Sequence, residues 1–85
     1  MKCQEVTVPM FAEGATVIRL SQWLRREGEK VDAGENLAEA TTDKIAIYIE
    51  APFNGYMHKI LVSEGDVVQV GQVIALMVHE LSEEV

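Results

Sequence analysis

The most constraining feature of this sequence is an internal repeat with a constant offset of 37 residues. Residues 27–38 and residues 64–75 both begin Glu-Gly-acid, place Val at the fourth or fifth position, and carry a second Gly six residues after the first. Upstream, Pro9 and Pro52 each open a turn-like segment that leads into an apolar stretch. Two copies are too few for an open solenoid. The repeat therefore predicts a pseudo-two-fold globule with halves at about residues 8–41 and 51–78.

The repeated units are typical of short β-strands. Residues 45–51 alternate, with Ile45, Ile47 and Ile49 on one face. We expect further strands at residues 4–8, 15–20, 37–40, 56–62 and 73–78. Glycines lie between these runs, at positions typical of tight turns. Several short strands separated by turns indicate a β-sandwich or a β-barrel.

One stretch also fits a helical pattern. Val17, Leu20 and Leu24 have helical spacing, with polar residues between them. The corresponding stretch of the second half, residues 56–62, is too short and too β-branched at its end for a stable helix. We therefore expect a strand over residues 15–20 and at most one helical turn near residues 23–26.

Composition excludes several classes of function. Fourteen acidic residues against seven basic ones give a net charge of −7, so there is no basic patch for nucleic acid or for an anionic membrane. No apolar run approaches the roughly 20 residues of a membrane-spanning helix, and no apolar signal segment precedes Val6. With 85 residues, 48% of them hydrophobic, the chain is expected to form one soluble domain.

The sequence predicts no catalytic residue and no metal ligand. Cys3 is the single cysteine, and no Cys/His cluster has metal-ligand spacing. His58 and His79 have no nucleophilic Ser or Cys in an elbow context, and we expect both to be half-exposed strand residues. We expect Trp23 to be a packing residue.

One polar segment, residues 41–44, joins two expected strands at the junction of the two halves. A strand, a short polar connection and a second strand predict a β-hairpin, with Lys44 at its tip. On the Asp-Lys dipeptide alone, Lys44 is an ordinary solvated turn lysine. The repeat that frames it favours a functional role.

Short motifs frame this hairpin from Val6 to about Met77. They are Val8-Pro9-Met10 with Glu13-Gly14, Trp23 with residues 27–31, Thr42-Asp43-Lys44, Ala51-Pro52 with Gly55, and residues 64–68 with Gly71. In this order and spacing they resemble the lipoyl domains of 2-oxo acid dehydrogenase complexes, close kin of biotinyl carrier domains. The family usually has an acid where Thr41 stands and often a smaller residue than Ile45.

The resemblance implies an all-β fold: a flattened barrel of two four-stranded antiparallel sheets related by a pseudo-two-fold axis. It implies that lipoic acid is joined in an amide to Nζ of Lys44, on an exposed hairpin of one sheet, with both termini close together in the other. It assigns recognition by partner enzymes to the residues around the lysine and to the segment 9–14. These recognition residues are Thr42, Asp43, Ile45, Met10, Phe11 and Glu13.

The resemblance also implies a carrier that is not catalytic by itself and is part of a larger dihydrolipoamide acyltransferase. Its partners would be a lipoate ligase or lipoyl transferase, a thiamin-diphosphate-dependent decarboxylase, the acyltransferase core and a flavin-containing dihydrolipoamide dehydrogenase. We expect the carrier domain to span residues 1–79 and residues 80–85 to be a frayed end or the start of a linker. The expected compartment is the cytoplasm, or the mitochondrial matrix in a eukaryote.

Three alternatives are open. A biotinyl carrier domain has the same fold and lysine position, but characteristically has methionine on both sides of the lysine, where this chain has Asp43 and Ile45. The glycine-cleavage carrier also bears lipoyl-lysine, but is longer and has additional helical elements. The third alternative is an unmodified barrel-sandwich adaptor in which Lys44 is only a turn residue.

Overall fold

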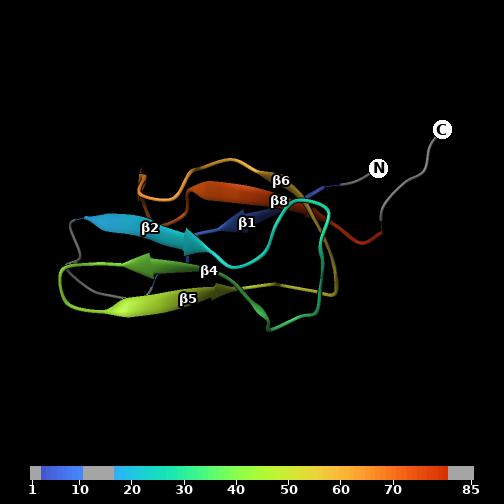
Figure 1. Cartoon of the computed structure of the whole chain (residues 1–85), viewed down its shortest axis with the longest axis horizontal. Coiled ribbons are helices and arrows are strands. Elements are labelled where there is room, and N and C mark those ends of the chain that lie inside the picture. The colour runs from blue at the N-terminus through green and yellow to red at the C-terminus, as the bar shows by residue number, and fades with distance from the viewer. Residues whose placement is uncertain (1–2, 11–16, 81–85) are drawn as a thin grey trace.

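The computed structural model describes residues 3–10 and 17–80, and these ranges contain eight strands and no helix (Figure 1). The strands are β1 (Gln4–Thr7), β2 (Ile18–Trp23), β3 (Lys30–Val31), β4 (Asn36–Thr41), β5 (Ala46–Glu50), β6 (Gly55–Ile60), β7 (Val67–Val68) and β8 (Val73–Val78). The predicted all-β class is confirmed.

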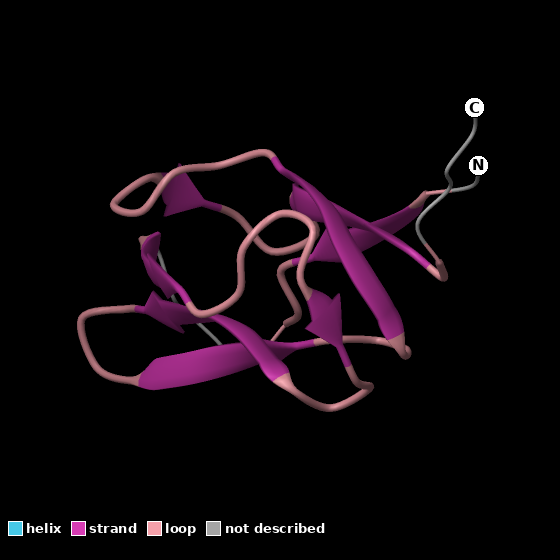
Figure 2. Cartoon of the chain, turned by 45° about the vertical axis from the view of Figure 1, so that its right-hand side comes forward, coloured by secondary structure: helices cyan, strands magenta, loops and turns pink. Residues whose placement is uncertain are grey.

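The strands form two antiparallel sheets of four strands each, as the sequence resemblance implied (Figure 2). One sheet has the order β1-β8-β6-β3 and the other β5-β4-β2-β7. Because β1 pairs with β8, the two ends of the described chain lie together. The hairpin between β4 and β5 lies at the opposite end of the molecule (Figure 1).

The pseudo-two-fold symmetry holds at the level of single backbone hydrogen bonds. The bounds of β6, β7 and β8 are those of β2, β3 and β4 moved by 37 residues. The Gly28 N–H donates to the Met57 carbonyl, and in the other half the Gly65 N–H donates to the Leu20 carbonyl, both at 2.6 Å. The predicted symmetry of the two halves is therefore confirmed.

Two glutamates extend this correspondence to side chains. The Trp23 N–H donates to the Glu64 carboxylate at 2.9 Å, and the Ile60 N–H donates to the Glu27 carboxylate at 2.8 Å. Each glutamate belongs to one half and accepts from the last residue of a strand in the other half. The Glu-Gly turns of the repeat therefore hold the two halves together.

The remaining pair of strands, β1 and β5, also correspond, although with a different offset. Val8 and Ala51 follow them and make matching bonds, since their carbonyls accept from the Gly71 and Gly34 N–H groups at 2.8 and 2.9 Å. Nine positions separate Pro9 from the start of β2, whereas three separate Pro52 from the start of β6. The first connection is thus the longer one.

The core lies between the two sheets and draws side chains from both. Its largest fully buried members include Leu20, Leu37, Met57, Ile74 and Met77. Along β2, buried Ile18 and Leu20 alternate with the exposed Arg19. No described side chain is both polar or charged and buried, so hydrophobic packing is the main source of stability.

No helical turn forms at residues 23–26, where at most one was expected. Strand β2 continues to Trp23, which pairs with Ala38, and the following Leu24 N–H donates to the Leu37 carbonyl at 2.8 Å. The Leu24 N–H is thus bonded to the neighbouring strand and the Trp23 N–H to Glu64, so neither is available for a helical i→i−4 bond. The register of β2 against β4 shifts between Leu20 and Gln22, within the stretch that has the helical spacing.

Gly65 gives a direct test of the turn geometry. It has φ of +93°, and its symmetry mate Gly28 has φ of +88°. A Cβ at Gly65 would meet no atom within 4 Å, so the cost of Gly65→Ala is conformational and not steric. We expect that cost to be about 1–2 kcal/mol, the penalty for an L-residue in the left-handed region.

The measurement for Gly65→Ala is the free energy of unfolding from urea denaturation. Ser63→Ala in the same turn is the matched control, since no described non-glycine residue has positive φ. The control is expected to change stability by less than about 0.5 kcal/mol. Equal stabilities for the two variants would contradict the argument.

Candidate functional site

Lys44 lies at the tip of the β4–β5 hairpin, as predicted. Thr41 and Ala46 form the last residue pair of the two strands, and residues 42–45 make the connection. Asp43, Lys44 and Ile45 are all exposed. Within the described part of the chain, the Lys44 side chain makes no hydrogen bond and no ion pair. The Nζ amine is therefore presented to solvent.

Thr42 organises the connection. Its N–H donates to the Ile45 carbonyl at 2.8 Å. Its Oγ1 accepts from the Lys44 N–H and from the Ile45 N–H, both at 3.1 Å, and donates to the Ile45 carbonyl at 3.4 Å. The side chain of Thr42 thus closes the turn that holds Lys44.

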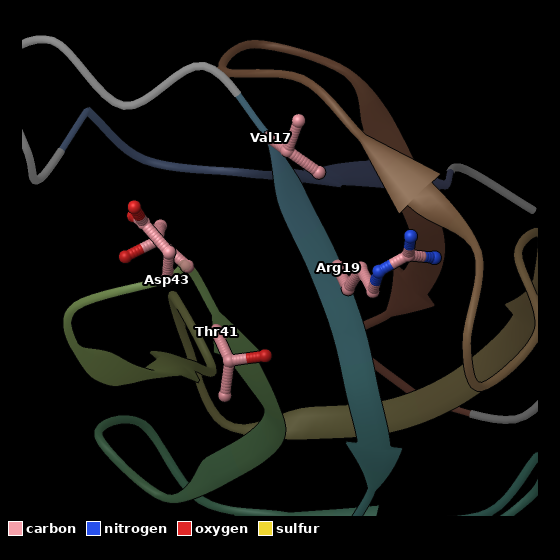
Figure 3. A pocket seen from close by; sticks show the side chains of 5 residues that line it. Val17, Arg19, Thr41 and Asp43 are labelled. Carbon is pink, nitrogen blue, oxygen red and sulfur yellow. The ribbon is translucent and has the colours of Figure 1, made fainter.

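A hollow of about 350 Å³ lies between the hairpin and strand β2 (Figure 3). Its lining residues are Val17, Arg19, Thr41, Thr42 and Asp43. Arg19 extends toward the β6–β7 connection, where its guanidinium donates to the Gly65 carbonyl at 3.2 Å. The hairpin tip therefore stands beside a hollow and not against packed core side chains.

The structure describes three of the other five predicted recognition residues, Asp43, Ile45 and Met10. Asp43 and Ile45 flank Lys44 directly and are exposed; Ile45 is 42% exposed despite being apolar. Met10 is 80% exposed in the connection that leaves β1. Phe11 and Glu13 lie outside the described residues, as do residues 81–85 of the expected end segment.

No chemical role was expected for the tryptophan, the two histidines or the cysteine, and the structure shows where each of them lies. Trp23 packs against the core, and its Nε1 donates to the Val62 carbonyl at 3.0 Å, which confirms it as a packing residue. His58 is half-buried on β6, as predicted. His79 follows β8 and is exposed, so the half-exposed strand position expected for it is wrong. Its ring stacks on Phe53 with ring centroids 4.2 Å apart. Cys3 is a free, exposed thiol.

Over residues 3–10 and 17–80, no three His, Cys, Asp or Glu side chains gather as a metal site would require. The same ranges hold no helix that is long and apolar enough to cross a membrane. What the hairpin offers chemically is one exposed primary amine at a fixed place in the fold. Such an amine can accept an acyl group and keep it far from the core.

Comparison with protein families shows to which family the chain belongs. Residues 4–77 match the biotin/lipoyl family model, described as "Biotin-requiring enzyme". The chain belongs to this family. The match covers every strand of the structure except the last residue of β8.

A curated relative points to the lipoyl branch of the family. The dihydrolipoyllysine-residue succinyltransferase component of the 2-oxoglutarate dehydrogenase complex of Staphylococcus saprophyticus is 40% identical over 73 residues. The alignment covers 86% of this chain and 17% of that protein, so the chain spans less than a fifth of its relative. The resemblance to lipoyl domains inferred from the sequence is thereby confirmed.

Solved structures of two kinds of protein resemble this fold. The lipoyl domain of the 2-oxoglutarate dehydrogenase complex of Azotobacter vinelandii has a TM-score of 0.72 and 25% identity, over 89% of this chain and 96% of that one. The urea carboxylase of Kluyveromyces lactis has a TM-score of 0.76 and 22% identity, over 92% of this chain and 6% of that one. The likeness of fold therefore extends beyond lipoyl domains.

Sequence reasoning placed Thr42 among the recognition residues and missed its role inside the turn. The signal was present, because a Thr two residues before the tip is suited to an ST-turn, in which the hydroxyl bonds the backbone further along the chain. That signal is weak without coordinates, since Thr41 stands next to it and makes no comparable side-chain bond among the described residues.

Proposed function

We propose that this chain is a lipoyl carrier domain that bears lipoic acid in amide linkage on Lys44. The observation that carries the proposal is the position of Lys44, exposed at the tip of a hairpin at the end of the molecule opposite the termini (Figure 1). When attached, lipoate supplies a dithiolane that carries acyl groups and electrons. The cofactor then performs the chemistry and the protein presents it.

The residues around Lys44 fit such a group. An amide removes the charge of the amine, and Lys44 has no ion-pair partner among the described residues that this would leave unpaired. Asp43 and Ile45 are exposed on either side, so no neighbouring side chain has to be displaced from the core. These surroundings support the proposal, because attachment at Lys44 requires no rearrangement of the sheets.

The chain's own contribution to function is presentation. Antiparallel pairing of β4 with β5 fixes the base of the hairpin from Asn36 and Glu50 up to Thr41 and Ala46. A tether at either end of the described chain would leave from the opposite end of the domain, where β1 pairs with β8. Tethering in one assembly raises the effective concentration of the carrier to about millimolar without tight binding.

The alternative is a biotinyl carrier, since the matching family model is described as "Biotin-requiring enzyme". The residues next to the lysine favour lipoate, since Asp43 and Ile45 stand where biotinyl domains have methionine. The sequence similarity to a dihydrolipoyllysine-residue succinyltransferase supports the same choice.

The partners and the compartment are part of the proposal. We place the domain in a 2-oxo acid dehydrogenase complex, served by a lipoate ligase or lipoyl transferase and visited by the decarboxylase, acyltransferase and dihydrolipoamide dehydrogenase sites. Met10, Asp43 and Ile45 are exposed and available for recognition by these enzymes. The proposed compartment is the cytoplasm, or the matrix in a eukaryote.

Mass spectrometry of the protein from its native source tests the proposal. A lipoyl increment that maps to the peptide containing Lys44 is the expected result. A biotinyl increment on the same peptide would establish the alternative. An unmodified lysine in protein from cells replete in lipoate would indicate the adaptor function instead.

A further inference from the structure

Two backbone donors of the hairpin tip converge on a single side-chain oxygen. The Lys44 and Ile45 N–H groups both lie 3.1 Å from Oγ1 of Thr42. The Thr42 Oγ1 also donates to the Ile45 carbonyl at 3.4 Å, and this carbonyl accepts from the Thr42 N–H at 2.8 Å as well. One threonine therefore binds both residues on the far side of the turn.

This turn needs such a restraint because the usual ones are missing. The favoured two-residue hairpin turns require positive φ, usually supplied by Gly or Asn. No described non-glycine residue has positive φ, and residues 42–45 contain no glycine. Among residues 3–10 and 17–80, packing gives the tip little support, since Thr42 and Asp43 line a hollow and Lys44 and Ile45 are exposed.

The hydrogen bonds to Thr42 Oγ1 are not repeated by the pseudo-two-fold symmetry of the molecule. The carboxylate bonds made by Glu27 and Glu64 occur in both halves of the molecule. The position that corresponds to Thr42, 37 residues on, is His79, which has no hydroxyl group and stacks on Phe53. The bonds from the Lys44 and Ile45 N–H groups to a side-chain hydroxyl thus occur in the β4–β5 hairpin and not at the symmetry-related position.

We propose that Thr42 is a positioning residue for the modification of Lys44: its hydroxyl orders the hairpin tip so that Nζ reaches a ligase at a set height and direction. The inference rests on the proposed carrier function. Thr42 acts through the backbone of Lys44 and Ile45 and has no contact with the reacting atoms.

The step that it assists is amide formation. The neutral Nζ amine attacks the carbonyl carbon of an activated lipoyl donor, a lipoyl adenylate or thioester, that the ligase or transferase supplies. A C–N bond forms, the C–O or C–S bond to the activating group breaks, and that group leaves with the electron pair. Nζ loses its extra proton to solvent or to a base of the enzyme. No oxidant or reductant is consumed.

The test compares three variants of the 85-residue chain in lipoylation by a lipoate ligase, with kcat and KM measured for the domain as substrate. Thr42→Val keeps the shape and removes the hydroxyl, and kcat/KM is expected to fall about tenfold, the equivalent of one or two neutral hydrogen bonds. Thr42→Ser keeps the hydroxyl and is expected to stay within about twofold of the unaltered chain.

Thr41→Val is the matched control. Thr41 adjoins Thr42, is equally half-buried and lines the same hollow, but its hydroxyl makes no hydrogen bond within the described part of the chain. Its kcat/KM is expected to stay within about twofold of the unaltered chain. Amide hydrogen exchange of unmodified protein gives a second measurement: exchange at Lys44 and Ile45 should become faster in Thr42→Val and not in Thr41→Val.

The outcomes are separable. Normal loading of Thr42→Val together with faster exchange at Lys44 and Ile45 would overturn the proposal, because the ligase would then not need an ordered tip. Equal losses in Thr42→Val and Thr42→Ser would overturn it too, since the hydroxyl would not be the cause. If Thr42→Val does not fold, Thr42→Ala takes its place in the same comparison. Failure of the unaltered chain to accept lipoate contradicts the carrier function itself, whatever the exchange data show.

Discussion

Lys44→Arg is expected to abolish lipoylation completely while leaving the fold unchanged. Arginine keeps the positive charge and much of the length of the side chain, and Lys44 is exposed, so the free energy of unfolding should change by less than about 0.5 kcal/mol. The guanidinium stays protonated in proteins and offers no free electron pair for attack on an acyl carbon. The measurement is lipoyl incorporation by a lipoate ligase, followed by mass analysis of the intact chain.

The same experiment has an internal control, because the chain carries other lysines. Lys30 on β3 and Lys59 on β6 are exposed, yet they lie on strands of the other sheet and not at a hairpin tip. Peptide mapping should find both unmodified, and Lys2 as well, in the unaltered chain and in Lys44→Arg. Residual lipoate on any of them in the variant would mean that exposure and not position selects the lysine.

The overall fold could be predicted because the same strand and turn signals occur in both halves of the sequence. Gly28 and Gly65 fall 37 residues apart, and both have φ near +90° in the structure. A turn signal that occurs twice at one spacing is stronger than either copy alone. The same argument placed Lys44 at the junction of the halves, where the structure has the β4–β5 hairpin.

The spacing of apolar residues was a less reliable guide where it fitted both a helix and a strand. The apolar spacing of Val17, Leu20 and Leu24 suggested a helical turn after the strand, whereas backbone bonding to β4 continues through Leu24. A register irregularity in β2 changes which face its last residues occupy, and the sequence carries no signal of it. Tertiary pairing therefore overrode the helical pattern.

The strand predicted from the alternating isoleucines begins one residue earlier than β5 does. Ile49 is buried, but Ile45 precedes β5 and is 42% exposed. Its N–H bonds to Oγ1 of Thr42 instead of taking part in the ladder. Side-chain closure of a turn depends on which nearby oxygen reaches which N–H, and that needs coordinates. For this reason the position of Lys44 was predictable and the means of holding it was not.

Exchange of Asp43 and Lys44 is expected to remove most or all lipoylation, because it moves the amine by one residue. The double change Asp43→Lys with Lys44→Asp keeps composition, net charge and the polarity of the turn, and both side chains are exposed. The bond from residue 44 to Thr42 uses a backbone N–H, so the exchange does not remove it. Stability should therefore stay within about 0.5 kcal/mol.

The expected loss of loading follows from geometry. Adjacent Cα atoms lie about 3.8 Å apart, and neighbouring side chains in a hairpin point in different directions, so the exchanged amine has a new origin and a new direction on an otherwise unchanged tip. Ligase loading of the exchanged chain is compared with that of the unaltered chain at equal concentration, with peptide mapping to locate any lipoate. Amide exchange at residues 44 and 45 confirms that the turn is intact. Normal loading of the exchanged chain would show that the enzyme accepts any lysine at the tip, and the requirement for a set height and direction would then be wrong.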